Sequence, residues 1–352
     1  MRQHVQFCTS ADGTRIATAS LGRGPPLLRA AHWLSHVEFD LESPVWRPWL
    51  LALADRNTYI RYDQRGCGLS DREVTDFSLD AWVSDLEAVV DTLGLERFPL
   101  LGMSQGGAVA IAYAHRHPEK VSRLILYGAY ARGALRRGGG ADERLEAETL
   151  VNLIRIGWGR DNATFRHVFG HRFLPAGTAE QHRWWHDLER ITASSEVAAR
   201  TLAGFQQIEV SALARQLRLP VLIMHSRGDV AVPFEEGRHL AALVPGARFV
   251  PLDSDNHVLL DSEPAWAHFQ AEVNAFLGQD VPRRAGRPVG LTVAEADVLG
   301  HLVQGLDNRT IAERLGKSEK TVRNQVSAIL AKLGVRTRAE AIVRARGDLA
   351  GS

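Results

Sequence analysis

The chain has 352 residues, of which 45% are hydrophobic and 24% are charged, and its formal net charge is +1. This composition is typical of packed globular cores, and the length suggests two or three domains. Cys8 and Cys67 have no metal-ligand spacing, the N-terminus has no signal-peptide core, and no stretch of about 18 residues is wholly apolar. We therefore expect a cytoplasmic protein that is neither secreted nor membrane-spanning, without a metal site or cofactor.

Short apolar runs alternate with helical patterns through residues 1–277. The first two runs, 5–8 and 15–21, flank Ala11-Asp12-Gly13 and predict a hairpin. Six further strands are predicted at 26–31, 57–63, 98–103, 121–127, 221–225 and 247–252. This alternation predicts an α/β fold, with a largely parallel sheet that helices cover on both faces.

A possible nucleophile follows the strand predicted at 98–103. Gly102-Met103-Ser104-Gln105-Gly106 fits G-x-S-x-G, and a helical pattern at 108–115 leaves this turn. A strand, a sharp turn and a helix in this order hold a serine with its hydroxyl exposed. The setting therefore predicts Ser104 as a nucleophile more strongly than the pentapeptide alone does.

A serine hydroxyl needs a base near neutral pH, and the base needs an orienting carboxylate. Asp229 lies just past the strand predicted at 221–225, and His257 follows the last strand. We predict Ser104, Asp229 and His257 as a catalytic triad. Two alternatives stay open: Asp229 could only cap a helix at 233–243, and the three residues could bind a ligand without turning it over.

These features, together with YDQRGCGLSD at 62–71, resemble the α/β-hydrolases over residues 1–277. The resemblance implies an oxyanion hole formed by the backbone N–H groups of Trp33 and Gln105. Ala31-His32 stands where that family usually has His-Gly before the first donor. The position of the segment 132–217, which is helical and rich in tryptophan and phenylalanine, predicts a lid over Ser104. We expect most of these aromatic side chains to pack the lid's own core.

The segment 278–290, GQDVPRRAGRPVG, has the composition of a linker. Helical patterns with turn signals follow it. Thr292 and Glu295 have capping-box spacing at the start of a first helix, which Gly305 is expected to end. Asn308 is predicted to cap a second helix that ends at Gly316. Ser318 is predicted to cap a third helix.

The predicted third helix has one apolar and one polar face. Val322, Val326, Ile329 and Leu333 recur at steps of three and four, so this face should be buried. Polar and basic side chains on the other face can reach base edges or phosphates, and two more lie at the start of the second helix. The predicted DNA-binding residues are Asn308, Arg309, Lys320, Thr321, Arg323, Asn324 and Ser327.

Residues 291–346 resemble the LuxR-type (NarL/FixJ-like) helix-turn-helix in LTVAEADVL, GLDNRTIAERL, SEKTVRNQVSAILAKLGV and TRAEAI. The resemblance implies a four-helix DNA-binding domain over 291–352, whose fourth helix, near 338–346, would form a homodimer on a two-fold operator. Charge fits this division, since 278–352 holds 13 Lys and Arg against 8 Asp and Glu. The alternative is a helical packing module with a solvated charged face.

The predicted catalytic triad and the predicted helix-turn-helix together suggest two possible functions. The first is a DNA-binding transcriptional regulator whose hydrolase domain senses a small ester, lactone or related acyl ligand, with or without hydrolysing it. The second is a serine hydrolase, an esterase or lactonase, whose tail serves only dimerisation or localisation. The fusion of the hydrolase to a sequence-reading motif favours the first.

Overall fold

The computed structural model describes residues 1–279 except 161, and residues 292–341 except 304, 305, 336 and 339. The chain forms two compact units, Met1–Leu277 and Gly278–Ser352. No helix among the described residues is both long enough and apolar enough to cross a membrane.

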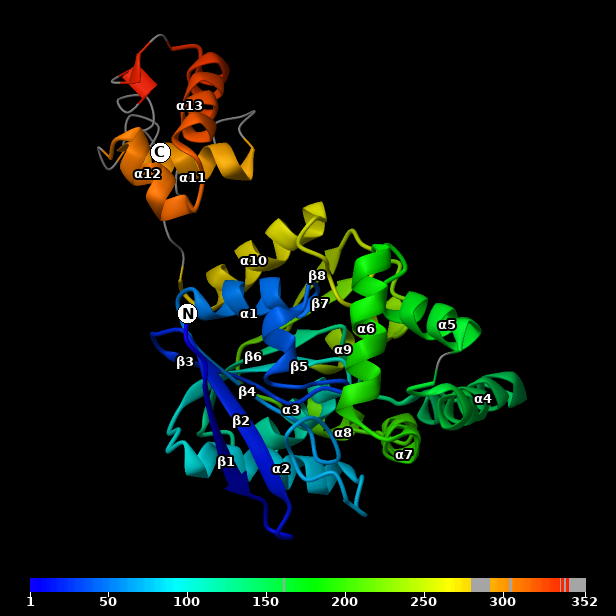
Figure 1. The fold of residues 1–352 in the computed structure, drawn as a ribbon. Helices are drawn as coiled ribbons and strands as arrows, with labels where there is room; N and C mark the ends of the chain where they lie inside the picture. Colours follow the sequence, from blue (N-terminus) through cyan, green and yellow to red (C-terminus); the bar gives the residue numbers. More distant parts are fainter. Residues whose placement is uncertain (161, 280–291, 304–305, 336, 339, 342–352) are drawn as a thin grey trace. The chain divides into compact units, whose positions relative to one another are not determined.

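The first unit is built on an eight-stranded sheet (Figure 1). The spatial order is β1-β2-β4-β3-β5-β6-β7-β8. The strands are β1 His4–Thr9, β2 Arg15–Leu21, β3 Pro26–Arg29, β4 Thr58–Tyr62, β5 Phe98–Met103, β6 Val121–Tyr127, β7 Val221–Ser226 and β8 Arg248–Leu252. β2 pairs antiparallel with β1 and β4, and the remaining pairs are parallel. The predicted α/β sheet is therefore confirmed.

Helices cover both faces of this sheet (Figure 1). One face carries α1 (Trp46–Ala54) and α10 (Pro264–Phe276), which meet where Trp49 contacts Trp266 and Phe269. The other carries α2 (Leu79–Thr92), α3 (Gly106–Arg116), the short α8 (Ser211–Ala214) and α9 (Phe234–Leu243), which contact one another in that order. β5 to β7 lie between the layers and are almost wholly buried, which explains their continuous apolar sequences.

The segment after β6 forms the helical insertion. It begins with a short 3-10 turn, η2 Ala134–Arg136, and its helices are α4 Ala141–Gly157, α5 Ala163–Phe173, α6 Ala179–Thr192 and α7 Ser195–Gln206. Another 3-10 turn, η1 Phe39–Glu42, precedes α1. Trp158 and Phe165 pack inside the insertion. The expectation that most of the seven tryptophan and phenylalanine side chains of 132–217 do so was wrong, because four of them line a cavity beside Ser104: Phe169, Phe173, Trp185 and Phe205.

Among the described residues of the second unit, three helices pack around a small apolar core. They are α11 Val293–Val303, α12 Asn308–Leu315 and α13 Glu319–Leu333. Val298 and Leu302 of α11 meet Ile311 of α12 and Val322 and Ile329 of α13. The predicted apolar face of α13 is therefore buried as expected.

The caps of these helices agree with the sequence except at one position. The Thr292 N–H donates to Glu295, and the Glu295 N–H donates to the Thr292 hydroxyl, which completes the capping box. Ser318 caps α13 as predicted. Asn308, however, is the first residue of α12, and Asp307 caps it by accepting from the Thr310 N–H.

Three sequence predictions fall wholly or mostly outside the described residues. They are the stop at Gly305, the linker at 278–290 and the fourth helix at 338–346.

The ion pair between Glu295 and Lys332 gives a testable expectation for the second unit. Lys332 Nζ lies 2.7 Å from a Glu295 carboxylate oxygen and joins α13 to the start of α11. Its hydrogen bond, together with that from Thr292, lowers the pKa of Glu295 from 4.5 to about 2. A depressed carboxyl pKa stabilises the fold above the unfolded value, and that contribution is lost as pH falls through the folded value.

Amide hydrogen exchange on the full chain measures this effect. At pH 7 Glu295→Gln should exchange faster than wild type in α11 and α13, whereas the control Glu313→Gln, in an exposed pair with Arg309, should not. After correction for intrinsic rates, wild type should approach Glu295→Gln between pH 4.5 and about 2. Identical protection at pH 7 would contradict the assigned role of the pair.

Candidate functional site

Ser104 lies on the tight turn between β5 and α3. Its φ is 53°, a left-handed backbone conformation that is strained for a residue with a side chain. Its N–H donates to the Tyr127 carbonyl, 2.9 Å away, which ties the turn to β6. The two flanking glycines are required sterically. A Cβ on Gly102 would lie 2.6 Å from the Gly107 Cα, and one on Gly106 would lie 2.6 Å from the Ala31 carbonyl oxygen.

His257 and Asp229 come together on the loops after β8 and β7. The His257 Nδ1 lies 2.6 Å from the Asp229 Oδ2, and both residues are buried. A carboxylate at this distance fixes the imidazole orientation and stabilises the imidazolium when the ring accepts a proton. Ser104 and His257 line the same cavity, while Asp229 contacts the histidine from behind.

The carboxylate of Asp229 is held from several sides. Its Oδ1 accepts hydrogen bonds of 2.9 Å from the N–H groups of Ala231 and Val232. Its Oδ2 also lies 3.5 Å from the Nε2 of His225, a buried histidine whose pKa burial lowers. Asp229 does not cap α9, because Pro233 occupies the N-cap and no side chain bonds there.

The two predicted oxyanion donors flank the serine. Trp33 and Gln105 both line the cavity, and within the described chain neither backbone N–H has a protein acceptor. Leu34, which follows Trp33, has a φ of 61°. The Asp63 carboxylate after β4 accepts from the Val37 N–H at 3.0 Å and supports the loop that carries Trp33. Sequence reasoning did not identify this support, because 26 residues separate the two groups.

His32, immediately before the predicted oxyanion donor Trp33, stands where α/β-hydrolases usually have glycine. Its ring stacks on Trp46 with 4.6 Å between centroids, and its Nδ1 lies 2.7 Å from the Trp33 carbonyl oxygen. Burial and the nearby Arg29 guanidinium hold the pKa of His32 well below its ordinary value. His32 therefore adds a neutral ring to the pocket wall and no positive charge near neutral pH.

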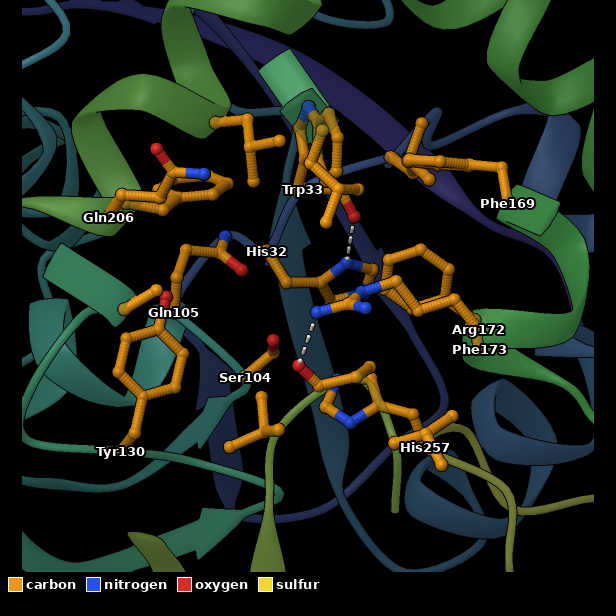
Figure 2. A pocket seen from close by; sticks show the side chains of 18 of the residues that line it. His32, Trp33, Ser104, Gln105, Tyr130, Phe169, Arg172, Phe173, Gln206 and His257 are labelled. Carbon is orange, nitrogen blue, oxygen red and sulfur yellow. Dashed lines mark hydrogen bonds between the residues drawn. The ribbon is translucent and has the colours of Figure 1, made fainter. Parts of the chain in front are cut away.

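A cavity of about 250 Å³ joins these groups (Figure 2). The wall that faces Ser104 consists largely of aromatic and aliphatic side chains from the lid and from the loop after β7. Those from the lid are Ala134, Ala147, Leu150, Phe169, Phe173, Trp185, Leu202 and Phe205. Such a pocket suits a small, mostly apolar ligand that presents a carbonyl group to the serine.

Two further residues of the pocket have no signature in the sequence. The Phe173 carbonyl, at the end of α5, accepts from the N–H groups of His257 at 3.0 Å and Val258 at 3.3 Å. The adjacent Arg172 points its side chain into the pocket (Figure 2). Sequence reasoning assigned this stretch to a lid, but helical periodicity does not show which residues of a lid meet a distant loop.

The second candidate site is the polar face of α13. Lys320, Thr321, Arg323, Asn324 and Ser327 are all exposed there. Arg323 pairs with Glu319, one turn earlier, at 3.0 Å.

The two residues predicted at the start of α12 differ from each other. Arg309 is exposed, whereas Asn308 is half-buried and its Oδ1 accepts from Arg338 at 2.8 Å. Arg309 is therefore placed to reach a phosphate more readily than Asn308.

Comparisons with known proteins agree with this architecture. Residues 39–264 match the family described as alpha/beta hydrolase fold, and residues 289–345 match bacterial regulatory proteins of the luxR family. The chain is 27% identical over 256 residues to the AB hydrolase superfamily protein YisY of Bacillus subtilis. This match spans 71% of the present chain and 91% of YisY.

Two solved esterase structures have the same fold as the first unit. Esterase RhEst1 from Rhodococcus sp. ECU1013 is 26% identical, with a TM-score of 0.65 over 78% of this chain and 98% of its own. The esterase from Exiguobacterium antarcticum is 24% identical, with a TM-score of 0.66 over 78% and 99%. The chain belongs to the α/β hydrolase fold family and carries in addition a DNA-binding domain of the luxR family of bacterial regulatory proteins.

Proposed function

We propose that this protein is a transcriptional regulator whose hydrolase domain binds a small ester, lactone or related acyl compound and hydrolyses it. One observation carries the proposal: the chain combines a luxR-family domain with a pocket lined by Ser104, His257 and two unbonded backbone N–H groups. The similarity to the Rhodococcus esterase favours ester chemistry in that pocket. The proposed place of action is the cytoplasm, where the DNA is.

The proposed reaction begins when the Ser104 Oγ attacks the acyl carbon and the His257 imidazole accepts the hydroxyl proton. The N–H groups of Trp33 and Gln105 bind the carbonyl oxygen as it becomes negative. His257 then donates its proton to the leaving oxygen, which leaves Ser104 acylated. Water attacks this ester through the same base, and the free acid and serine are released. Asp229 holds the imidazole throughout.

On the DNA side, the exposed face of α13 is proposed to enter the major groove, with Arg309 on a phosphate. Charge-neutralising contacts from one copy are few, so we propose that two copies bind a two-fold site as a homodimer. Ligand in the pocket would then change DNA affinity only if it binds two states of the protein unequally.

A second candidate keeps the same chemistry without regulation. The contact between His257 Nδ1 and Asp229 Oδ2, at 2.6 Å, supports the hydrolysis that both candidates share. The C-terminal domain would then serve only to dimerise or localise the enzyme. The two candidates differ in whether the state of the pocket changes DNA affinity.

Intact mass after incubation with a fluorophosphonate tests the nucleophile. Wild type should gain one adduct, and Ser104→Ala should gain none. Asp229→Asn should react at least about a hundredfold more slowly, because an amide stabilises the wrong histidine tautomer. Arg144→Gln, an exposed substitution on α4, should react like wild type. Labelling of Ser104→Ala at the wild-type rate would exclude Ser104 as the nucleophile.

The same adduct tests regulation, because it occupies the pocket without turnover. An operator is first selected from random duplex DNA, and its affinity is measured by fluorescence anisotropy for labelled and unlabelled protein. The regulator predicts a change of at least about fivefold in either direction. Equal affinities would favour the second candidate, and an absence of any selected sequence would contradict regulation.

The DNA face has its own test. Lys320→Ala should weaken binding of all sequences and lower the salt slope by about one, as expected for loss of a phosphate contact. Asn324→Ala should instead change the preferred bases. Arg144→Gln, which removes an exposed positive charge from α4 of the hydrolase domain, is the control. Unchanged affinity and unchanged specificity in both variants would remove this face from the interface.

A further inference from the structure

Arg172 is the one arginine of α5 that lines the pocket in the described chain (Figure 2). Its Nη2 donates to the Ala231 carbonyl at 3.4 Å, which places the guanidinium beside the loop that holds Asp229. About a third of the side chain, 31%, is exposed. A cation therefore lies in the same cavity as the predicted nucleophile.

The charge of this guanidinium is only partly neutralised. The carboxylate paired with it belongs to Glu146, which is 3.8 Å away and has a side chain that is 67% exposed. Asp229 is near, but its oxygens already accept from two backbone N–H groups and the His257 ring. Burial lowers the pKa of Arg172, although Glu146 and Asp229 act in the opposite direction. A partly buried cation in this state gains from a ligand anion.

Apart from Glu146, no carboxylate that lines the pocket in the described chain pairs with Arg172. Arg137, which lies 3.8 Å from the buried Glu236, is a second cation, and His32 is held neutral. Glu143 and Glu146 both lie on exposed positions of α4. The remainder of the wall near Arg172 is largely apolar, and Arg137 is already paired with Glu236, so Arg172 is the more favourable partner for an anionic group of a bound ligand.

Arg172 also lies where two hollows meet. A second hollow lies between α4 and α5 and shares Glu146, Leu150, Phe169, Arg172 and Val230 with the cavity around Ser104. Arg172 is therefore one of the five residues that line both hollows. An anionic group bound there would leave the rest of the molecule against the apolar wall.

We propose that Arg172 binds a free carboxylate of the ligand, so that the compound recognised by the pocket is an ester or lactone that also carries a negative charge. This inference rests on the proposed function and names its substrate class. Arg172 acts as a specificity-determining residue and takes no part in proton transfer.

Two matched probes test the proposal. Monomethyl adipate has a methyl ester and a free carboxylate, and methyl 6-methylheptanoate replaces that carboxylate with an isopropyl group of similar shape. The measured quantity is the ratio of kcat/KM for the charged probe to that for the neutral probe. Wild type, Arg172→Gln, Arg172→Lys and Arg144→Gln are compared, where Arg144→Gln removes an exposed lid charge that does not line the cavity.

The ratio should favour monomethyl adipate in wild type and fall by about tenfold to a hundredfold in Arg172→Gln, the range expected for loss of a hydrogen-bonded ion pair. Arg172→Lys should keep part of the preference, since it keeps the charge but loses the planar fork. Arg144→Gln should keep all of it. An unchanged ratio in Arg172→Gln, or equal losses for both probes, would show a purely structural arginine and overturn the proposal.

Titration calorimetry with Ser104→Ala separates this proposal from the proposed hydrolysis. Monomethyl adipate should bind at least about tenfold more tightly than the neutral probe, and Ser104→Ala/Arg172→Gln should lose that difference. This result without turnover by wild type would refute hydrolysis and uphold the carboxylate site. Turnover by wild type, together with equal affinity for both probes, would uphold hydrolysis and overturn the carboxylate site. No measurable binding of monomethyl adipate would overturn the carboxylate site.

Discussion

The hydrogen bonds accepted by the Phe173 carbonyl join the lid to the predicted base. This one oxygen receives the N–H groups of His257 and Val258, and the Phe173 ring also packs edge-on against the imidazole, with 5.7 Å between centroids. The Oδ1 of Asn256 accepts a further hydrogen bond from the Ala176 N–H. A carbonyl at a helix C-terminus has no partner within its own helix, so it is free to bind a loop. The position of α5 therefore fixes the loop that carries His257.

The other components of the site are attached to the sheet. Ser104 lies at the end of β5, and Asp63, just past β4, holds the loop of Trp33 through Val37. The pocket is thus bounded by two parts, a rigid sheet edge with the nucleophile and a lid that contacts the base. A ligand that contacts Phe169 or Arg172 touches the lid directly, so the proposed ligand would contact the sheet edge and the lid at once.

Several parts of the site could be predicted from local sequence. The strand, turn and helix around Ser104 are contiguous, and Asp229 and His257 each follow a predicted strand, so topology alone brings them to one sheet edge. The spacing of the sequence correctly predicted the helix caps Thr292 and Ser318. The observed cap of α12, Asp307, lies one residue before the predicted cap. Asp307 and Asn308 are both good cap residues, and only the backbone bond to Thr310 distinguishes them.

The sequence by itself determined the two-part organisation, the sheet and the chemical type of each predicted site, because these depend on periodicity and on short contiguous motifs. Only the tertiary structure decided which lid residues face the serine. Arg172 and Phe173 meet loops that lie 59 and 84 residues away in the chain. Such contacts depend on how helices pack over a sheet edge, and one-dimensional periodicity carries no information on that packing. The anionic character proposed for the ligand therefore came from the folded chain alone.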